Sequence, residues 1–169
     1  MQDHIIYLSN TSGVKVGITR LTQLPTRWID QGAQQALAVL KVSKRYHAGL
    51  VEVAFKSYLN DKTNWRTLLK NEYSEQNLHE IFQTVWPQAK AQLAESVLGD
   101  VEVIIEKEQN HDISYPALTY PEKINSYNLD KNPLIIDTLT AIKGQYLIFE
   151  NGVINIRKYA GYQVKLEVL

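Results

Sequence analysis

The sequence contains no cysteine, which excludes disulfides and thiolate metal sites within this chain. A reducing compartment fits that composition. No apolar run approaches the roughly 20 residues of a membrane-spanning helix. No signal-peptide pattern opens the chain. We therefore expect a soluble cytoplasmic protein without a membrane partner.

Several catalytic motifs are missing as well. There is no glycine-rich phosphate loop, no dinucleotide-binding fingerprint and no Ser-His-Asp arrangement. The four histidines are scattered without the spacing of metal ligands, so His4 and His47 are expected to be bystanders. These absences argue against P-loop enzymes, triad hydrolases and histidine-rich zinc sites.

A net charge of zero hides an asymmetry between the two parts of the chain. Residues 1–70 hold ten lysines and arginines against four acidic residues, a net charge of +6. Residues 71–169 hold eight against fourteen, a net charge of −6. The basic part is a candidate for binding a polyanion such as nucleic acid. The alternative is two solvated faces that differ in charge.

The stretch Ile5–Arg27 organises the chain and predicts a tight β-hairpin. Apolar runs at Ile5–Leu8 and Val14–Ile18 flank a polar turn. A helix is predicted over Thr26–Gln35, whose first part Gly32 can close, and the run Leu37–Val42 predicts a third strand beside the hairpin.

The middle of the chain is predicted to be mainly helical. The expected elements are a helix over Tyr46–Leu59, for which a strand is the alternative, a polar connection over Asn60–Asn71, a helix capped by Ser74 that ends or bends near Pro87, a second helix over Gln88–Leu98, and a strand over Val101–Glu106.

The C-terminal part predicts a small β-rich unit, such as an open barrel. Its expected strands are Leu134–Ile142, a hairpin over 145–157 turned by Asn151-Gly152, and Tyr162–Val168. We therefore predict an α+β fold with an N-terminal domain at 1–72, a helical segment and strand at 73–109, and a β-rich C-terminal module at 110–169.

Three residues carry the groups that phosphodiester hydrolysis needs. A carboxylate such as Glu52 can hold a hard divalent cation. An arginine such as Arg27 offsets charge on the phosphate. A phenol such as Tyr7 can orient or deprotonate a water. The structural alternatives are a packed Tyr7, and a Glu52 that pairs with Lys56 one helical turn on.

The same region resembles the GIY-YIG nuclease superfamily. IIYL, KVGIT, a later arginine and a glutamate on a following helix match the phage-type branch. The resemblance implies a small three-stranded sheet flanked by helices. It also implies Tyr7, Arg27 and Glu52 as catalytic residues, with Glu52 holding Mg²⁺ or Mn²⁺, and Gly17 as the glycine of the second signature.

This sequence departs from that pattern at three positions. Ile5 replaces the first glycine, Lys15 stands where the second tyrosine is usual, and Lys56 stands where the phage-type branch often has histidine. Lys15, Arg20 and Lys56 are candidate contacts to nucleic-acid phosphates, against the alternative that they face solvent. Trp65 is expected in the core or in a cleft wall.

A second resemblance covers nearly the whole chain. KVGITR, PTRWIDQGA, YPEKINSYNLDK and IKGQYLIFENGVINIRKYAGY resemble a bacterial family, domain of unknown function 2797. That resemblance implies a cysteine-rich, zinc-binding segment upstream, and hence a shortened chain here. Within NIRKYAGY, basic and aromatic residues including Arg157 interleave as on single-strand-binding surfaces. An ordinary strand with alternating faces is the favoured alternative.

The leading functional hypothesis is a metal-dependent endonuclease-like domain acting on DNA or RNA. A second hypothesis is a nucleic-acid-binding module that keeps the scaffold without the chemistry. A third is an assembly domain whose acidic half meets a partner or the basic half of a second copy. Salt separates the last from the others, because phosphate binding weakens as salt rises.

Overall fold

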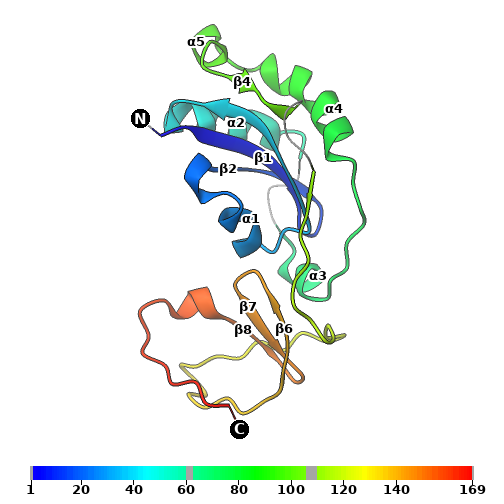
Figure 1. The fold of residues 1–169 in the computed structure, drawn as a ribbon, viewed down its shortest axis with the longest axis vertical. Coiled ribbons are helices and arrows are strands. Elements are labelled where there is room, and N and C mark those ends of the chain that lie inside the picture. The colour runs from blue at the N-terminus through cyan, green and yellow to red at the C-terminus, as the bar shows by residue number, and fades with distance from the viewer. Residues whose placement is uncertain (1, 60–62, 106–109, 169) are drawn as a thin grey trace.

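The computed structural model describes residues 2–59, 63–105 and 110–168 (Figure 1). It shows a mixed α+β chain with two antiparallel sheets and short to medium helices, in agreement with the predicted class. The elements in chain order are β1 (His4–Asn10), β2 (Val14–Arg20), η1 (Leu21–Gln23), α1 (Thr26–Asp30), β3 (Gln35–Val42), α2 (Arg45–Lys56), α3 (Trp65–Leu69), α4 (Leu78–Lys90), α5 (Glu95–Leu98), β4 (Glu102–Val103), β5 (His111–Asp112), β6 (Leu139–Lys143), β7 (Tyr146–Phe149), β8 (Val153–Asn155) and η3 (Ile156–Tyr159).

The N-terminal sheet is built on the predicted hairpin. Its strand order is β2-β1-β3-β4, and the short strand β5 also pairs with β3. The three predicted strands are therefore present, and two short strands extend the sheet beyond β3. β1 and β2 pair so that Tyr7 lies opposite Gly17.

Alternation along β1 separates two hydrophobic layers, since successive side chains of a strand point to opposite faces. Ile6 and Leu8 belong to the larger core cluster, which α2 and α4 complete. Ile5 and Tyr7 belong to the second cluster, in which Trp28 of α1 takes part. The sheet is thus covered on both faces, and Tyr7 lies on the α1 side.

The C-terminal sheet has the strand order β6-β7-β8. The Asn-Gly hairpin is confirmed: Phe149 N–H donates to the carbonyl of Gly152 over 2.8 Å, and β7 pairs with β8. Three strands leave the unit an open sheet and not a barrel. Figure 1 shows it at the opposite end of the molecule from α5, with the β6–β7 turn pointing towards α1 and α3.

That turn joins the two sheets. Gly144 has φ +57°, and a side chain there would bring its Cβ within 2.9 Å of the Gly32 nitrogen. The buried Lys143 donates its Nζ to Asn71 Oδ1 over 2.7 Å. Burial lowers the pKa of Lys143 to about 8. Tyr115 adds a hydrogen bond of 2.8 Å to the carbonyl of Ala33.

Several predicted boundaries were wrong. α1 ends at Asp30 and not at Gln35, because Gly32 turns the chain with φ +71° into β3. Pro87 lies inside α4 and does not end it. It is exposed, as is Gln83, whose carbonyl loses its helical partner, so water can satisfy that carbonyl.

The remaining differences concern caps and tails. Asn77, not Ser74, caps α4, accepting from Glu80 N–H over 3.2 Å. The predicted strand Tyr162–Val168 forms no ladder, and its residues are exposed. The strand predicted over 101–106 shrinks to β4. Residue 106 of that predicted strand lies outside the described residues, as do residues 60–62 of the predicted polar connection. The helix over 46–59 is confirmed as α2, against the strand alternative.

In the described ranges, every helix is too short or too polar to cross a membrane.

We predict that Gly17→Ala destabilises the fold by about 1–3 kcal/mol, as overpacking of a core does. A Cβ at position 17 would lie 2.5 Å from the Tyr7 hydroxyl and from its Cζ, and the buried ring has no room to move. Urea unfolding measures the change.

Gly49→Ala in α2 is the matched control. Its Cβ would meet only the Arg45 guanidinium at 3.7 Å, so we expect up to about 1 kcal/mol of stabilisation from helix propensity. Equal effects of the two substitutions would contradict the close packing of Tyr7 on Gly17.

Candidate functional site

Tyr7 anchors the candidate site from the middle of β1. The side chain is fully buried, and its hydroxyl donates to Gln31 Oε1 over 2.8 Å. The ring crosses Gly17 on the edge strand β2 and meets the edge of the Trp28 ring, with the centroids 6.0 Å apart. Its orientation is therefore set before any ligand binds.

Arg27 and Glu52 both act on the Tyr7 hydroxyl. Burial raises the pKa of Tyr7, while the charge and hydrogen bond of Arg27 and the hydrogen bond to Gln31 lower it. The negative charge of Glu52 raises it further. The net shift is upward, so the phenol keeps its proton at neutral pH. Arg27 and Glu52 are thus both within electrostatic range of the Tyr7 hydroxyl, and the charge of Glu52 makes the smallest of these contributions.

Lys15 lies beside this group. Its Nζ donates to Thr63 Oγ1 over 2.7 Å. Its pKa is lowered, first by burial and second by the positive charge of Arg27. A half-buried lysine and arginine held together are costly for the free protein unless an anion meets them.

The other predicted phosphate contacts lie differently. Arg20 ends β2 as an exposed side chain and does not line the cleft described below. Lys56 approaches Glu52 in α2, with 3.8 Å between Nζ and Oε1. The helical pair that the sequence offered as the structural alternative is therefore present.

A cleft of about 320 Å³ opens between the N-terminal sheet and the C-terminal unit. Lys15, Arg27, Asp30 and Trp65 line one side, and Tyr146 and Arg157 line the other. Three cations against one carboxylate make it electropositive. Tyr7 and Glu52 are not among the lining residues, and Arg27 connects the cleft to Tyr7 through its hydrogen bond to the hydroxyl.

The comparison with protein families decides the family of the chain. A family model described as protein of unknown function (DUF2797) matches residues 1–164. The chain belongs to this family. The whole-chain resemblance in the sequence is thereby confirmed. No curated protein and no solved structure matches the DUF2797 chain.

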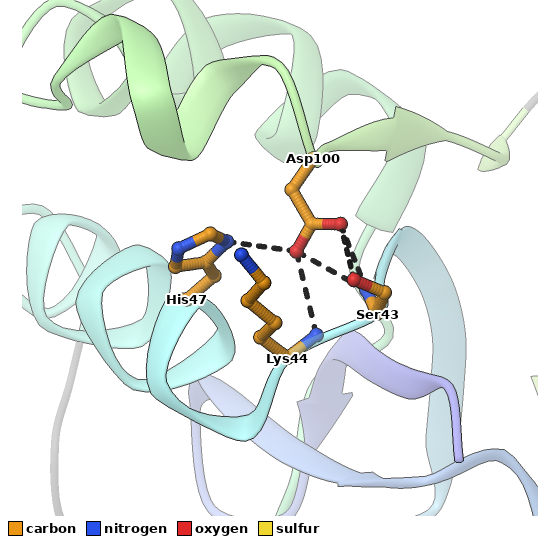
Figure 2. Close-up of polar contacts among 4 residues, drawn as sticks. All are labelled: Ser43, Lys44, His47 and Asp100. Atoms are coloured by element: carbon orange, nitrogen blue, oxygen red, sulfur yellow. Dashed lines mark hydrogen bonds and ion pairs between the residues drawn. The ribbon is translucent and has the colours of Figure 1, made fainter. Parts of the chain in front are cut away.

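In this DUF2797 chain, a carboxylate from outside α2 holds the helix that carries Glu52. Asp100 accepts hydrogen bonds from the Ser43 hydroxyl over 2.5 Å and from His47 Nδ1 over 2.8 Å (Figure 2). The backbone N–H groups of Ser43 and Lys44 also donate to it. Lys44, the N-cap residue, has no side-chain cap of its own, so Asp100 supplies the negative charge that a helix N-terminus favours.

The Ser43, His47 and Asp100 cluster is a cap and not a catalytic triad. The serine hydroxyl is bonded to the carboxylate and not to the imidazole, so no base is placed to activate it. His47, expected to be a bystander, therefore has a structural partner.

Two features of the site escaped the sequence reasoning. Gln31 receives the Tyr7 hydrogen bond, and its place four residues after Arg27 was the signal that could have found it. The sequence places Arg157 only in the interleaved motif NIRKYAGY, for which an ordinary strand is the favoured interpretation. The structure puts it in η3, on the far wall of the cleft.

We predict that Asp100→Asn lowers stability at neutral pH by about 1 kcal/mol, as loss of a helix cap does. Burial raises the pKa of Asp100, but hydrogen bonds from Ser43, His47 and Lys44 outweigh it and hold the pKa at about 2, against 3.8 for a free carboxyl. The folded-state pKa is depressed, so the contribution is complete above pH 3.8 and disappears as the pH falls towards 2.

Unfolding in urea across pH 2–7 measures this, with the exposed Asp112→Asn in β5 as control. The parent and Asp100→Asn curves should converge at the acid end. A constant difference across the whole range would contradict the cap.

Proposed function

We propose that the chain is a metal-dependent endonuclease-like protein of GIY-YIG type, acting on nucleic-acid phosphodiesters at Tyr7, Arg27 and Glu52. The observation that supports this is that Arg27 hydrogen-bonds to one buried phenol, Tyr7, on which the charge of Glu52 also acts, next to an electropositive cleft. Gly17 supports the finer likeness, because the ring of the first-signature tyrosine packs on the second-signature glycine.

Arg27 offsets the charge that develops on the phosphate, and Lys15 beside it adds a second cation. Tyr7 keeps its proton, because burial raises its pKa. It therefore orients a water or an oxygen of the substrate, and the phenolate role considered from the sequence is the less favoured of the two. Gln31 holds the hydroxyl at 2.8 Å and fixes its direction.

The donor chemistry at Glu52 fits Mg²⁺ or Mn²⁺. Among the residues described, no three histidine, aspartate or glutamate side chains gather as a metal site. Mg²⁺ is nevertheless commonly held by one or two carboxylates, with waters and substrate phosphates completing its shell. Glu52 would be that carboxylate, and Lys56 at 3.8 Å would have to yield to the ion. When bound, such a cation lowers the pKa of water and stabilises the leaving oxygen.

One observation favours the second candidate, a binding module without chemistry. The Tyr7 hydroxyl is already bonded on the buried side of the cleft, and Glu52 is already paired with Lys56. Under this reading the cations of the cleft bind nucleic acid and the three central residues serve packing. It predicts salt-sensitive binding without cleavage, and unchanged affinity in Glu52→Ala.

We predict that the parent cleaves DNA or RNA oligonucleotides with Mg²⁺ or Mn²⁺ and that Glu52→Gln abolishes cleavage. Arg27→Ala should lose about 10²–10³-fold in rate, the loss expected when one charge-stabilising donor is removed. Tyr7→Phe keeps the ring on Gly17 and should lose about 10²-fold or more, if the hydroxyl takes part in proton transfer or water orientation.

Glu150→Gln is the matched control, since it removes a carboxylate from the exposed β7–β8 turn. It should cleave like the parent. Cleavage by Glu52→Gln at the parent rate would contradict the assignment of Glu52 to the nuclease site. Salt-sensitive binding with no cleavage by the parent would establish the second candidate.

A further inference from the structure

The cleft draws its two walls from distant parts of the chain. Lys15, Arg27 and Trp65 come from the N-terminal part, and Tyr146 and Arg157 from the C-terminal unit. The contacts of Lys143 and Gly144 hold the second wall in place without a ligand. A wall positioned in advance reduces the ordering that a ligand has to bring about.

The cations that line this cleft lack an acidic ion-pair partner among the described residues. Within residues 2–59, 63–105 and 110–168, no carboxylate forms an ion pair with Lys15, Arg27 or Arg157. Arg157 is exposed and faces the opposite wall from η3. Cations on both walls of one cleft focus a positive potential between them, which attracts a phosphate chain.

An aromatic pair lies in the same cleft. The rings of Trp65 and Tyr146 are nearly parallel, at 5°, with centroids 6.4 Å apart, and both side chains are half-buried. The Arg66 guanidinium lies 4.4 Å from the centre of the Trp65 ring. Aromatic side chains next to a basic groove are the elements by which proteins hold single-stranded nucleic acid, because any unpaired base can stack on them.

We propose that this cleft binds single-stranded nucleic acid, with a phosphate between Lys15 and Arg157 and an unpaired base against the side of the Tyr146 ring that is turned away from Trp65. Its volume of about 320 Å³ is that of a small-ligand pocket. It takes a nucleotide unit, while the bases of a duplex are stacked and paired and cannot present a face to it. The inference rests on the proposed function and names its substrate, and its test requires binding only.

The test is fluorescence anisotropy with labelled oligothymidylate and oligouridylate, each alone and annealed to its complement, in EDTA so that nothing is cleaved. We expect the single strands to bind about tenfold tighter than the duplexes. Tyr146→Ala should weaken single-strand binding about tenfold, within the range that loss of one base–aromatic stack produces. The comparison of oligothymidylate with oligouridylate shows whether DNA or RNA is the preferred ligand.

Arg157→Ala is the second variant. Its exposed side chain can be removed without disturbing the core, so it should fold. It should weaken binding about threefold to tenfold and reduce the salt slope by about 1, as loss of one phosphate contact does. Tyr73→Ala and Lys131→Ala remove an exposed aromatic and an exposed cation outside the cleft, and both should bind like the parent.

Equal affinity for single strands and duplexes, or parent-like binding by Arg157→Ala and a folded Tyr146→Ala, overturns the inference. The proposed function fails separately. A parent that binds single strands but never cleaves them contradicts the nuclease and supports this site. A parent that cleaves, with Arg157→Ala and Tyr146→Ala that bind like the parent, supports the nuclease and contradicts this binding site.

Discussion

The ring of Tyr7 lies across the α-carbon of Gly17, and the N-terminal domain is arranged around this contact. It joins the central strand to the edge strand at a point where no other side chain fits. It also holds the phenol on the face that α1 covers, so that Arg27 and Gln31 reach the hydroxyl. A change in strand register by one residue would turn Tyr7 to the opposite face and separate it from all of them.

The helix that carries Glu52 depends on a different anchor. Glu52 sits on α2, whose own N-cap residue offers no side-chain acceptor. Asp100, from the loop after α5, accepts hydrogen bonds from four donor groups at that end and ties the middle of the chain to the first domain (Figure 2). This segment therefore holds the helix that carries Glu52, and its described residues, 73–105, are not part of the cleft lining.

The C-terminal unit completes the cleft. Gly144 packs so closely on Gly32 that the β6–β7 turn and α1 act as one surface, and Lys143 and Tyr115 fasten the same junction. Trp65 packs on Tyr146 across it. The C-terminal part of the chain is acidic overall, yet it supplies the cation Arg157 to this cleft. The other two cations of the cleft, Lys15 and Arg27, come from the basic N-terminal part.

The sequence by itself determined the two hairpins and the helix carrying Glu52. These depend on local periodicity and turn residues, which act between near neighbours. It misplaced the end of α1, the cap of α4 and the effect of Pro87, because those depend on the surroundings of each position. Only the tertiary structure decided that Asp100 caps α2 and that Arg157 faces Lys15 and Arg27. Such contacts between distant segments arise from the packing of whole elements, and no local pattern encodes that packing.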